Sequence, residues 1–222
     1  MYCFDSIEFD SLETLLSQGQ TLADLSQTGN ACSALGIELN GQRYFVKYAN
    51  QPAGRQALRR VNQLHTQVQD PVIWPLLQFA DTDTQTFLIY RWCSGASLYQ
   101  AAPERDQQDS RLNLFRQLPL SLRLSFLTQI YLAHLKIAQA GWIMVDFYDG
   151  SVLFDAQSQQ IHLIDLDEYR PGTFELDAER LPGSLRFMAP EEFNKGSLID
   201  QVSNVFALGA CAREFLQFWT SI

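Results

Sequence analysis

Residues that bind metals or form disulfides are scarce in this chain. It has four cysteines and three histidines among 222 residues. The cysteines stand far apart, at Cys3, Cys32, Cys93 and Cys211, and no two histidines have the short spacing of metal ligands. This pattern argues against a zinc site and predicts free thiols in a reducing, cytoplasmic compartment.

Charged residues are also few, and acidic ones predominate. They make up 18% of the chain, and the formal net charge of -9 goes with an isoelectric point near 4.7. An acidic protein is repelled by phosphate backbones and by anionic lipid, so the charge argues against nucleic-acid and membrane partners. A surface of this sign favours solubility and, weakly, a basic substrate.

Long apolar runs are absent too. The most apolar long segment, residues 205–219, is shorter than a membrane span and contains Arg213 and Glu214. The first ten residues have neither the basic nor the apolar run of a signal peptide. Because 46% of the residues are hydrophobic, we expect a folded, cytoplasmic protein that buries a sizeable core as one domain or two small lobes.

Carboxylates follow apolar runs in one stretch of the chain, Gly141 to Asp167. Asp146 and Asp165 each follow an apolar run. Residues 152–154 and 161–164, joined by a polar turn, predict a hairpin of two short strands. Unpaired carboxylates at the ends of buried strands would cost roughly several kcal/mol without a cation to share. A divalent metal with phosphate is the natural partner.

Four segments, taken in order, resemble the signature motifs of protein kinases. They are Gly141–Ser151, Asp165–Asp167, Gly183–Glu191 and Asn204–Gly209. The first resembles the catalytic loop G-I-x-H-R-D-L-K-x-x-N, the second resembles D-F-G, and the third is similar to the substrate-binding segment that ends in A-P-E. Any one alone would be a weak signal, but four in this order are strong. The chain is most similar to small bacterial serine/threonine-kinase-like proteins.

The resemblance implies an α+β, two-lobed protein kinase-like fold. It would have a small antiparallel β-sheet lobe with one helix and a mainly helical second lobe that lacks its C-terminal part. We expect an N-terminal extension at residues 1–20, the first lobe at 21–91, a hinge at 92–98 and the second lobe at 99–222.

Local patterns support this division. Asn40-Gly41 between two alternating runs predicts a hairpin, and the apolar spacing in residues 52–68 predicts the helix of the first lobe. Residues 121–140 predict a long helix that Ser121 can cap. Residues 99–120, rich in Gln, Asp and Arg, predict a solvated loop with a short helix.

The first lobe contains the residues that resemble a nucleotide site. Gly29 stands in the place of the glycine-rich loop, which here keeps one glycine of three, and it would let the backbone approach a phosphate. Lys47 ends a strand similar to V-A-I-K. A lysine there also fits an edge residue pointing to water, but its place before a helix favours phosphate binding. Trp92 and Cys93 lie where the linker between kinase lobes binds adenine.

The second lobe contains the residues that resemble the catalytic and metal-binding groups. The resemblance implies that Asp146 accepts the proton of a substrate hydroxyl and that Asp165 holds Mg²⁺ against the phosphates of ATP. Ser151 stands where kinases have the asparagine that binds a second metal ion. Ser184 resembles the hydroxyl that ties the substrate-binding segment to the catalytic aspartate. ATP and Mg²⁺ are the implied cofactors.

Two positions depart from the kinase pattern. The helix at residues 52–68 carries no acid to pair with Lys47, and the expected glutamate falls on Arg60 or Val61. Either Arg60 contacts phosphate, another acid substitutes, or the nucleotide site is weakened. Val145 replaces the arginine of H-R-D, so a phosphate on the activation segment would find no partner there. Regulation by such phosphorylation is therefore not expected.

The end of the sequence departs further. Residues 203–219 resemble the central helix of the large lobe, which other helices normally surround. Glu191 would lack its usual arginine from those helices. An apolar patch would be left uncovered at Phe215, Leu216, Phe218 and Trp219. We expect self-association through this helix, a partner chain, or an incomplete domain.

Three hypotheses for the function remain open. The favoured one is an ATP-dependent phosphotransferase of the serine/threonine protein kinase type, acting on a protein substrate. The second is a pseudokinase, a nucleotide-binding or scaffold module without catalysis, which the missing helix acid and the sparse glycines support. The third, a kinase of small molecules, shares the two aspartates but would not need residues 186–192 in this form.

Overall fold

The computed structural model describes residues 8–26 and 31–217 of the chain. They fall into two compact units: Met1–Gln67 with Trp74–Cys93, and Val68–Ile73 with Ser94–Ile222. Gly29 of the predicted nucleotide site lies outside the described residues, and so do Cys3, Phe218 and Trp219. Across the described ranges, each helix is too short or too polar to cross a membrane.

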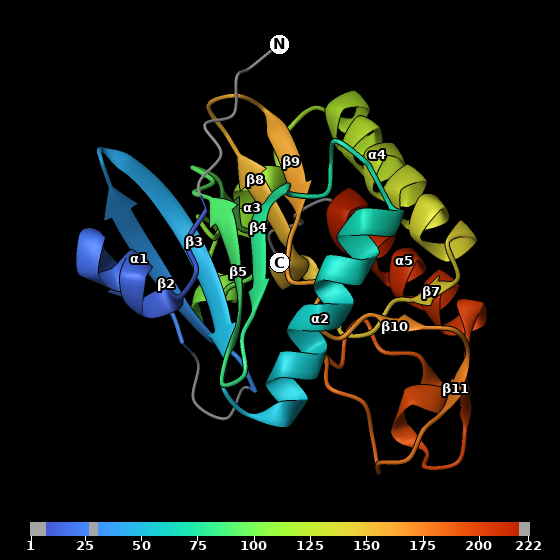
Figure 1. Cartoon of the computed structure of the whole chain (residues 1–222). Helices are drawn as coiled ribbons and strands as arrows, with labels where there is room; N and C mark the ends of the chain where they lie inside the picture. The colour runs from blue at the N-terminus through green and yellow to red at the C-terminus, as the bar shows by residue number, and fades with distance from the viewer. Residues whose placement is uncertain (1–7, 27–30, 218–222) are drawn as a thin grey trace. The chain divides into compact units, whose positions relative to one another are not determined.

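The first unit is built on a five-stranded antiparallel sheet in the order β1-β2-β3-β5-β4 (Figure 1). Its elements are α1 (Leu12–Gln18), β1 (Gln20–Asp24), β2 (Ser33–Leu39), β3 (Gln42–Ala49), α2 (Pro52–Gln67), β4 (Leu76–Asp81) and β5 (Thr86–Arg91). The predicted turn joins β2 to β3, with φ of 51° at Asn40 and 74° at Gly41. These left-handed values are the ones that a tight hairpin turn requires.

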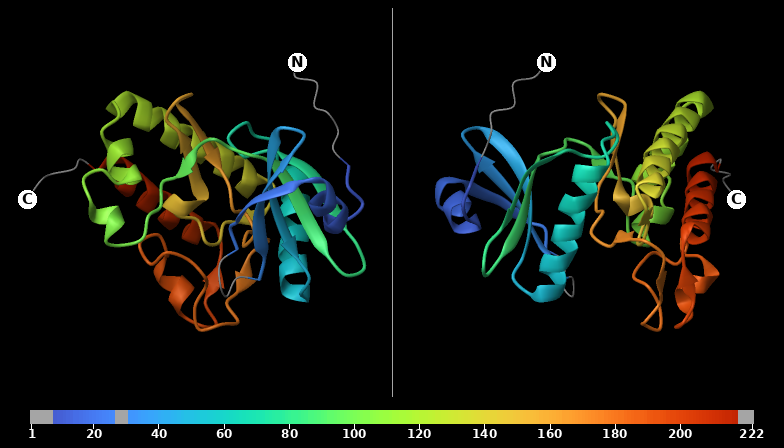
Figure 2. Two further views of the ribbon diagram at one scale, coloured as in Figure 1. Left: turned by 90° about the vertical axis from the view of Figure 1, so that its left-hand side faces the viewer. Right: turned by 45° about the vertical axis from the view of Figure 1, so that its right-hand side comes forward.

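Side chains alternate along the strands, so the sheet has two apolar faces. On one face Leu15 of α1 is buried with Ile37 and Val46. On the other, Val61 of α2 is buried with Leu88. Figure 2 shows the two helices on opposite faces of the sheet. The helix near the N-terminus is therefore part of the core of the first unit.

Within its described residues, up to residue 217, the second unit contains three α-helices and three small sheets. The helices are α3 (Arg111–Arg116), α4 (Leu120–Gln139) and α5 (Gln201–Leu216), and short 3-10 turns are η1 (Glu104–Asp106), η2 (Asp149–Ser151) and η3 (Pro190–Phe193). The strands are β6 (Ala96–Ser97), β7 (Trp142–Ile143), β8 (Val152–Asp155), β9 (Gln160–Leu163), β10 (Arg170–Pro171), β11 (Phe174–Glu175) and β12 (Leu198–Ile199). The predicted hairpin is confirmed, because β8 pairs antiparallel with β9, and β6 extends it.

The long helix predicted at residues 121–140 is confirmed as α4, although Pro119 and not Ser121 is its N-cap residue. The prediction of a solvated loop at residues 99–120 is wrong in part. Helix α3 buries Leu112 and Phe115, since its apolar face packs in the core of the second unit. Ser110 caps this helix by accepting a hydrogen bond from the backbone of Asn113.

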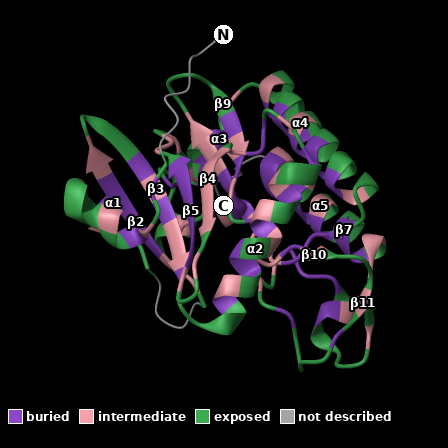
Figure 3. Cartoon of the chain, viewed as in Figure 1, coloured by how far each residue is buried: buried purple, intermediate pink, exposed green. Residues whose placement is uncertain are grey.

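The predicted uncovered patch at the end of α5 is also wrong in part. Phe215 is fully buried, because its ring lies 4.8 Å from the ring of Phe115. The exposed apolar side chains of α5 are instead near its start, at Val202, Val205 and Phe206. Figure 3 colours the described residues by their burial. Self-association through this helix stays a prediction.

Gly54 in α2 provides a test of how closely the helix packs on the sheet. A Cβ at this position would clash with the backbone carbonyl of Ala31 and would lie 2.8 Å from the Cβ of Ala49. Alanine gains about 1 kcal/mol of helix propensity over glycine, but overpacking costs about 1–3 kcal/mol. Gly54→Ala is therefore expected to lower the free energy of unfolding by about 1 kcal/mol, measured by urea denaturation.

The matched control is Gly209→Ala in α5, where a Cβ would meet no atom within 4 Å. This variant should gain stability by up to about 1 kcal/mol, since propensity alone acts. Equal effects of the two substitutions would contradict the close packing of α2 on the sheet.

Candidate active site

Two aspartates lie where strands of the second unit end. Asp146 follows β7 and the buried residues Met144 and Val145, and Asp165 lies two residues after β9. The backbone N–H of Ile164 donates to the carbonyl of Ser151 over 2.9 Å. This bond joins the exit of the hairpin to the loop that follows Asp146.

Both aspartates have an uncommon backbone conformation. The φ angle is 59° at Asp146 and 63° at Asp165, in the left-handed region that costs about 1 kcal/mol or more for a residue with a Cβ. Two other non-glycine residues with positive φ among those described, Asn40 and Gln159, lie in tight hairpin turns. Strained backbone away from turns is concentrated at functional sites. The backbone conformation therefore indicates that Asp146 and Asp165 are functional residues.

The electrostatics of two tyrosines places the aspartates in the same part of the second unit. Burial, together with the charges of Asp165 and Asp146, raises the pKa of Tyr148 to about 12. Burial and the same two carboxylates also hold the pKa of Tyr169 well above its ordinary value. Each phenol therefore stays protonated near neutral pH, beside a concentration of negative charge.

His134 of α4 packs against the loops that contain Asp146 and Asp165. Its ring is buried and hydrogen-bonds the carbonyl of Ile130 over 2.8 Å and the hydroxyl of Tyr169 over 2.9 Å. The ring also meets Phe147 edge-on at 4.7 Å. His134 thus contacts one residue next to Asp146 and another shortly after Asp165, so it helps to fix both loops.

Because the ring of His134 is buried, the free energy of unfolding should depend on pH. Burial lowers the pKa of His134 from its ordinary 6.5 to about 4. Between these values the unfolded chain binds the proton and the folded chain does not. The contribution of neutral His134 is therefore complete above pH 6.5 and is lost as the pH falls to about 4, by up to about 3 kcal/mol.

The variant His134→Gln removes this titration. Its deficit in unfolding free energy relative to the parent protein should shrink as the pH is lowered from 6.5 to 4, measured by urea denaturation at each pH. Thr128→Ala, on the exposed side of the same helix, should show a deficit that does not change with pH. A constant deficit for His134→Gln would contradict the inference.

Ser151 is buried and holds the loop after Asp146. Its hydroxyl donates to the carbonyl of Asp146 over 3.3 Å and accepts from the backbone N–H of Tyr148 over 3.4 Å. One lone pair of its oxygen is left for a further contact. The predicted role of Ser151 as a metal ligand stays a prediction, and its visible role is to fix the loop.

The substrate-binding segment predicted at residues 183–191 runs beside Asp146. A Cβ at Gly183 would lie 3.6 Å from Oδ1 of Asp146, and the φ of Gly183 is 146°, so glycine suits this close approach. Ser184 follows directly, and its carbonyl accepts from the N–H of Phe187 over 2.9 Å. The proposed tie between the Ser184 hydroxyl and Asp146 stays a prediction.

The same segment is anchored at its far end by two glutamates. Glu191, which was expected to lack the arginine of the kinase pattern, accepts a hydrogen bond of 2.6 Å from the hydroxyl of Ser203 in α5. Glu192 is buried and accepts from the backbone N–H of Ala189 over 2.5 Å. The far end of the segment is thus attached to α5.

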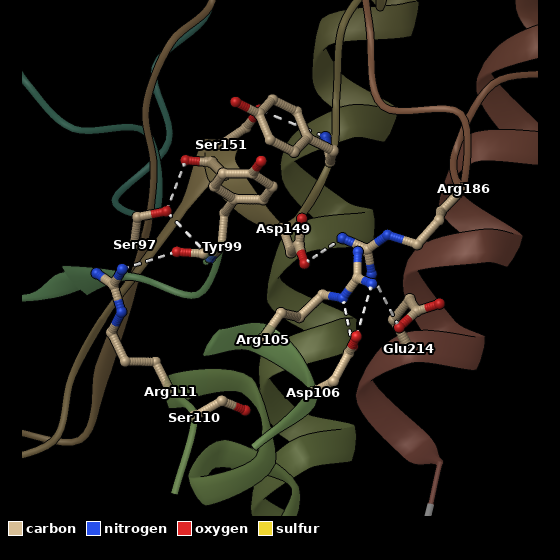
Figure 4. A network of polar contacts seen from close by, with 12 residues as sticks. Ser97, Tyr99, Arg105, Asp106, Ser110, Arg111, Asp149, Ser151, Arg186 and Glu214 are labelled. Atoms are coloured by element: carbon tan, nitrogen blue, oxygen red, sulfur yellow. Dashed lines mark hydrogen bonds and ion pairs between the residues drawn. The ribbon is translucent and has the colours of Figure 1, made fainter. Parts of the chain in front are cut away.

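A network of arginines and acids in the second unit could not be predicted from the sequence (Figure 4). Arg186 donates to Asp149 over 2.7 Å and to Glu214 of α5 over 3.2 Å. Glu214 also accepts from Arg116 of α3 over 2.7 Å. No short spacing in the sequence brings these four residues together, because they come from four separate segments.

Lys47, the predicted phosphate ligand, lies near the end of β3 and is half-buried. Its backbone pairs with Ala34 and Leu88 in the neighbouring strands. Side chains alternate along a strand, so Lys47 shares a face with Phe45 and Ala49, which pack with α2. It does not lie on an edge strand, and the reading of Lys47 as an edge residue is therefore wrong.

The residues predicted to bind adenine lie at the end of the first unit. The backbone N–H of Trp92 donates to the carbonyl of Arg43 over 2.9 Å, so this group already belongs to the sheet. The ring of Trp92 covers Gly36, where a Cβ would lie 2.8 Å from it. Cys93 is half-buried. Adenine binding by these two residues stays a prediction.

The donors in the second unit fit a magnesium ion better than a transition metal. Within residues 8–26 and 31–217, no three His, Cys, Asp or Glu side chains form a metal-binding group. Mg²⁺ is commonly bound by one or two carboxylates together with substrate phosphates and water. Asp165 is exposed and supplies such a carboxylate, so the residues present fit Mg²⁺ carried by a nucleotide.

Comparisons with known proteins identify the fold. No family model and no curated protein sequence matches the chain. Among solved structures, the kinase PK-1 of Cydia pomonella granulovirus matches with a TM-score of 0.69 and 15% sequence identity, over 95% of this chain and 73% of that chain. The α+β, protein kinase-like fold expected from the motifs is thereby confirmed.

Proposed function

We propose that this protein is an ATP-dependent phosphotransferase of the serine/threonine protein kinase type. It would transfer the γ-phosphate of Mg-ATP to a hydroxyl of a protein substrate. The observation that carries the proposal is the joint placement of Asp146 and Asp165. Both have left-handed backbone and both act on Tyr148 and Tyr169, within a kinase-like fold.

The roles of the residues follow from phosphoryl-transfer chemistry. The carboxylate of Asp146 accepts the proton of the substrate hydroxyl while the hydroxyl oxygen attacks the γ-phosphorus and ADP leaves. Asp165, with Ser151 as a second candidate ligand, would hold Mg²⁺. When bound, this ion supplies positive charge that neutralises the phosphate oxygens. Lys47 would supply an ammonium for the phosphates that are not transferred.

The second candidate is a pseudokinase that binds a nucleotide or a partner without catalysis. Two observations favour it. Helix α2 has Arg60 and Val61 where an acid is expected, and Val61 is buried in the apolar core. The hydroxyl of Ser151 already contacts two backbone groups, which leaves it a single lone pair for a metal.

Two measurements separate these candidates. Transfer of radiolabel from γ-labelled Mg-ATP to protein, above the level of Asp146→Asn, is the result expected for the enzyme. Binding of Mg-ATP alone should raise the unfolding free energy by about 2.7 kcal/mol at about 100 times the dissociation constant. Stabilisation without transfer would support a nucleotide-binding pseudokinase, and the absence of both effects would overturn both the enzyme and nucleotide binding.

A further inference from the structure

Arg186 links the substrate-binding segment to the catalytic loop by a buried ion pair. Its Nη2 lies 2.7 Å from Oδ2 of Asp149, whose side chain is 0% exposed. The other oxygen of this carboxylate, Oδ1, is buried and has no hydrogen-bond partner among the described residues. The charge of Asp149 therefore depends on Arg186 for its compensation, since a buried carboxylate is costly without a cation.

The guanidinium of Arg186 is fixed from a second side. Its Nη1 lies 3.2 Å from Oε2 of Glu214, which is nearly buried and also accepts from Arg116. Figure 4 shows Arg186 reaching Asp149 on one side and Glu214 on the other. A planar guanidinium that binds two carboxylates has little rotational freedom, in contrast to an ammonium group.

The position of this link in the two loops gives it a role in the reaction. Asp149 lies three residues after Asp146, and Arg186 lies three residues after Gly183, which is next to Asp146. One ion pair therefore joins the two loops close to the point where the substrate hydroxyl would have to meet Asp146. A change in this link would move the segment relative to the carboxylate.

We propose that Arg186 is a positioning residue: through Asp149 and Glu214 it holds residues 183–189 beside Asp146 without any phosphate on the segment. The inference deepens the proposed phosphotransferase function and rests on it. In the kinase pattern an arginine before the catalytic aspartate can bind such a phosphate, but here that residue is the buried, apolar Val145. Arg186 supplies the fixed cation from the segment itself.

The experiment compares Arg186→Met with Arg170→Met. Arg170 lies between Asp165 and the substrate-binding segment, and its guanidinium stacks on the ring of Phe174 at 4.5 Å. Each variant therefore loses one guanidinium, but at a different place in the chain. We expect Arg186→Met to lower kcat by about 100-fold, as a misplacement of about 1 Å can do. KM for Mg-ATP should stay within about 2-fold, because no contact to the nucleotide is removed. Arg170→Met should change neither.

Two further variants keep the test valid if Arg186→Met folds poorly. Asp149→Asn with Arg186→Met leaves no unpaired buried charge, and this double variant should lose no more activity than Arg186→Met alone, because the two side chains act as a pair. Arg186→Lys keeps the charge but not the two-sided contact, and it should recover part of kcat. Independent, multiplicative losses in the double variant, or an unchanged kcat in Arg186→Met, would overturn the proposal.

The inference can fail separately from the proposed function. If the parent protein transfers no phosphate, the function fails, and backbone amide exchange then decides on positioning. Exchange in residues 183–187 should be at least about 10-fold faster in Arg186→Met and in the double variant than in the parent, with no change in Arg170→Met. Unchanged exchange would overturn it. In an active enzyme, treatment with a phosphatase should leave kcat unchanged, and loss of activity would overturn the phosphate-independent role.

Discussion

Replacing Asp146 by asparagine is expected to lower kcat for phosphate transfer by about 10²–10⁴-fold. This is the range that a positioned general base contributes. Asparagine has nearly the same shape as aspartate and can adopt the left-handed φ of 59° at this position. The loop should therefore keep its conformation, and KM for Mg-ATP should change by less than about 3-fold. Steady-state kinetics with labelled ATP measures both constants.

Asp177→Asn is the matched control. Asp177 is exposed and belongs to the loop that leads to the substrate-binding segment, so it loses the same charge without contacting Asp146. Its kcat should equal that of the parent protein. If both variants retained full activity, Asp146 would not be the base, and the assignment of the catalytic loop would be wrong.

Replacing Phe115 by alanine is expected to lower the unfolding free energy of the second unit by about 3–5 kcal/mol, the usual cost of truncating a buried phenylalanine. The ring of Phe115 lies 5.8 Å from that of Phe126, 5.3 Å from that of Phe154 and 4.8 Å from that of Phe215. These three rings come from α4, β8 and α5. Removing the central ring would leave a cavity that several elements border.

Urea denaturation measures this effect, with Leu114→Ala as the control. Leu114 is the preceding residue on α3 and is 51% exposed, so its truncation should cost less than about 0.5 kcal/mol. A similar loss in both variants would mean that α3 is not part of the core. A small loss in Phe115→Ala would mean that the second unit repacks around the missing ring.

The parts of the fold that could be predicted have strong local patterns. The hairpin of β8 and β9 follows from two short apolar runs around a polar turn, and α4 follows from its apolar spacing. Asp146 and Asp165 could be singled out because each follows such a run. Local sequence thus determined both the elements and the position of the acids at their ends.

The short helix was predicted, but the burial of α3 could not be, because its segment reads as polar. Gln, Asp and Arg surround Leu112 and Phe115, so the apolar face is short and gives a weak periodic signal. The helix is stabilised by tertiary contacts with the three rings described above, which override local propensity. The burial of Phe215 was not predicted for the same reason, since Phe115 of α3 packs against its ring.

The network around Glu214 was missed for a different reason. Arginine and glutamate are ordinary surface residues, and nothing in the sequence marks Arg116, Arg186 and Glu214 as partners across separate segments. Arg123 is a parallel case: it lies on the buried side of α4 and donates to the carbonyl of Phe215 over 2.9 Å. Buried charges of this kind depend on the tertiary fold alone.

The hydrogen bond between Glu191 and Ser203 affects how this segment responds to dissolved salt. An ion pair at a surface weakens as dissolved salt screens it, with a Debye length of about 10 Å at 0.1 M ionic strength. Glu191 instead meets an uncharged hydroxyl at 2.6 Å, a contact that is short-ranged and little screened. The Glu191–Ser203 contact should therefore hold the end of the segment on α5 as firmly in concentrated salt as in dilute buffer.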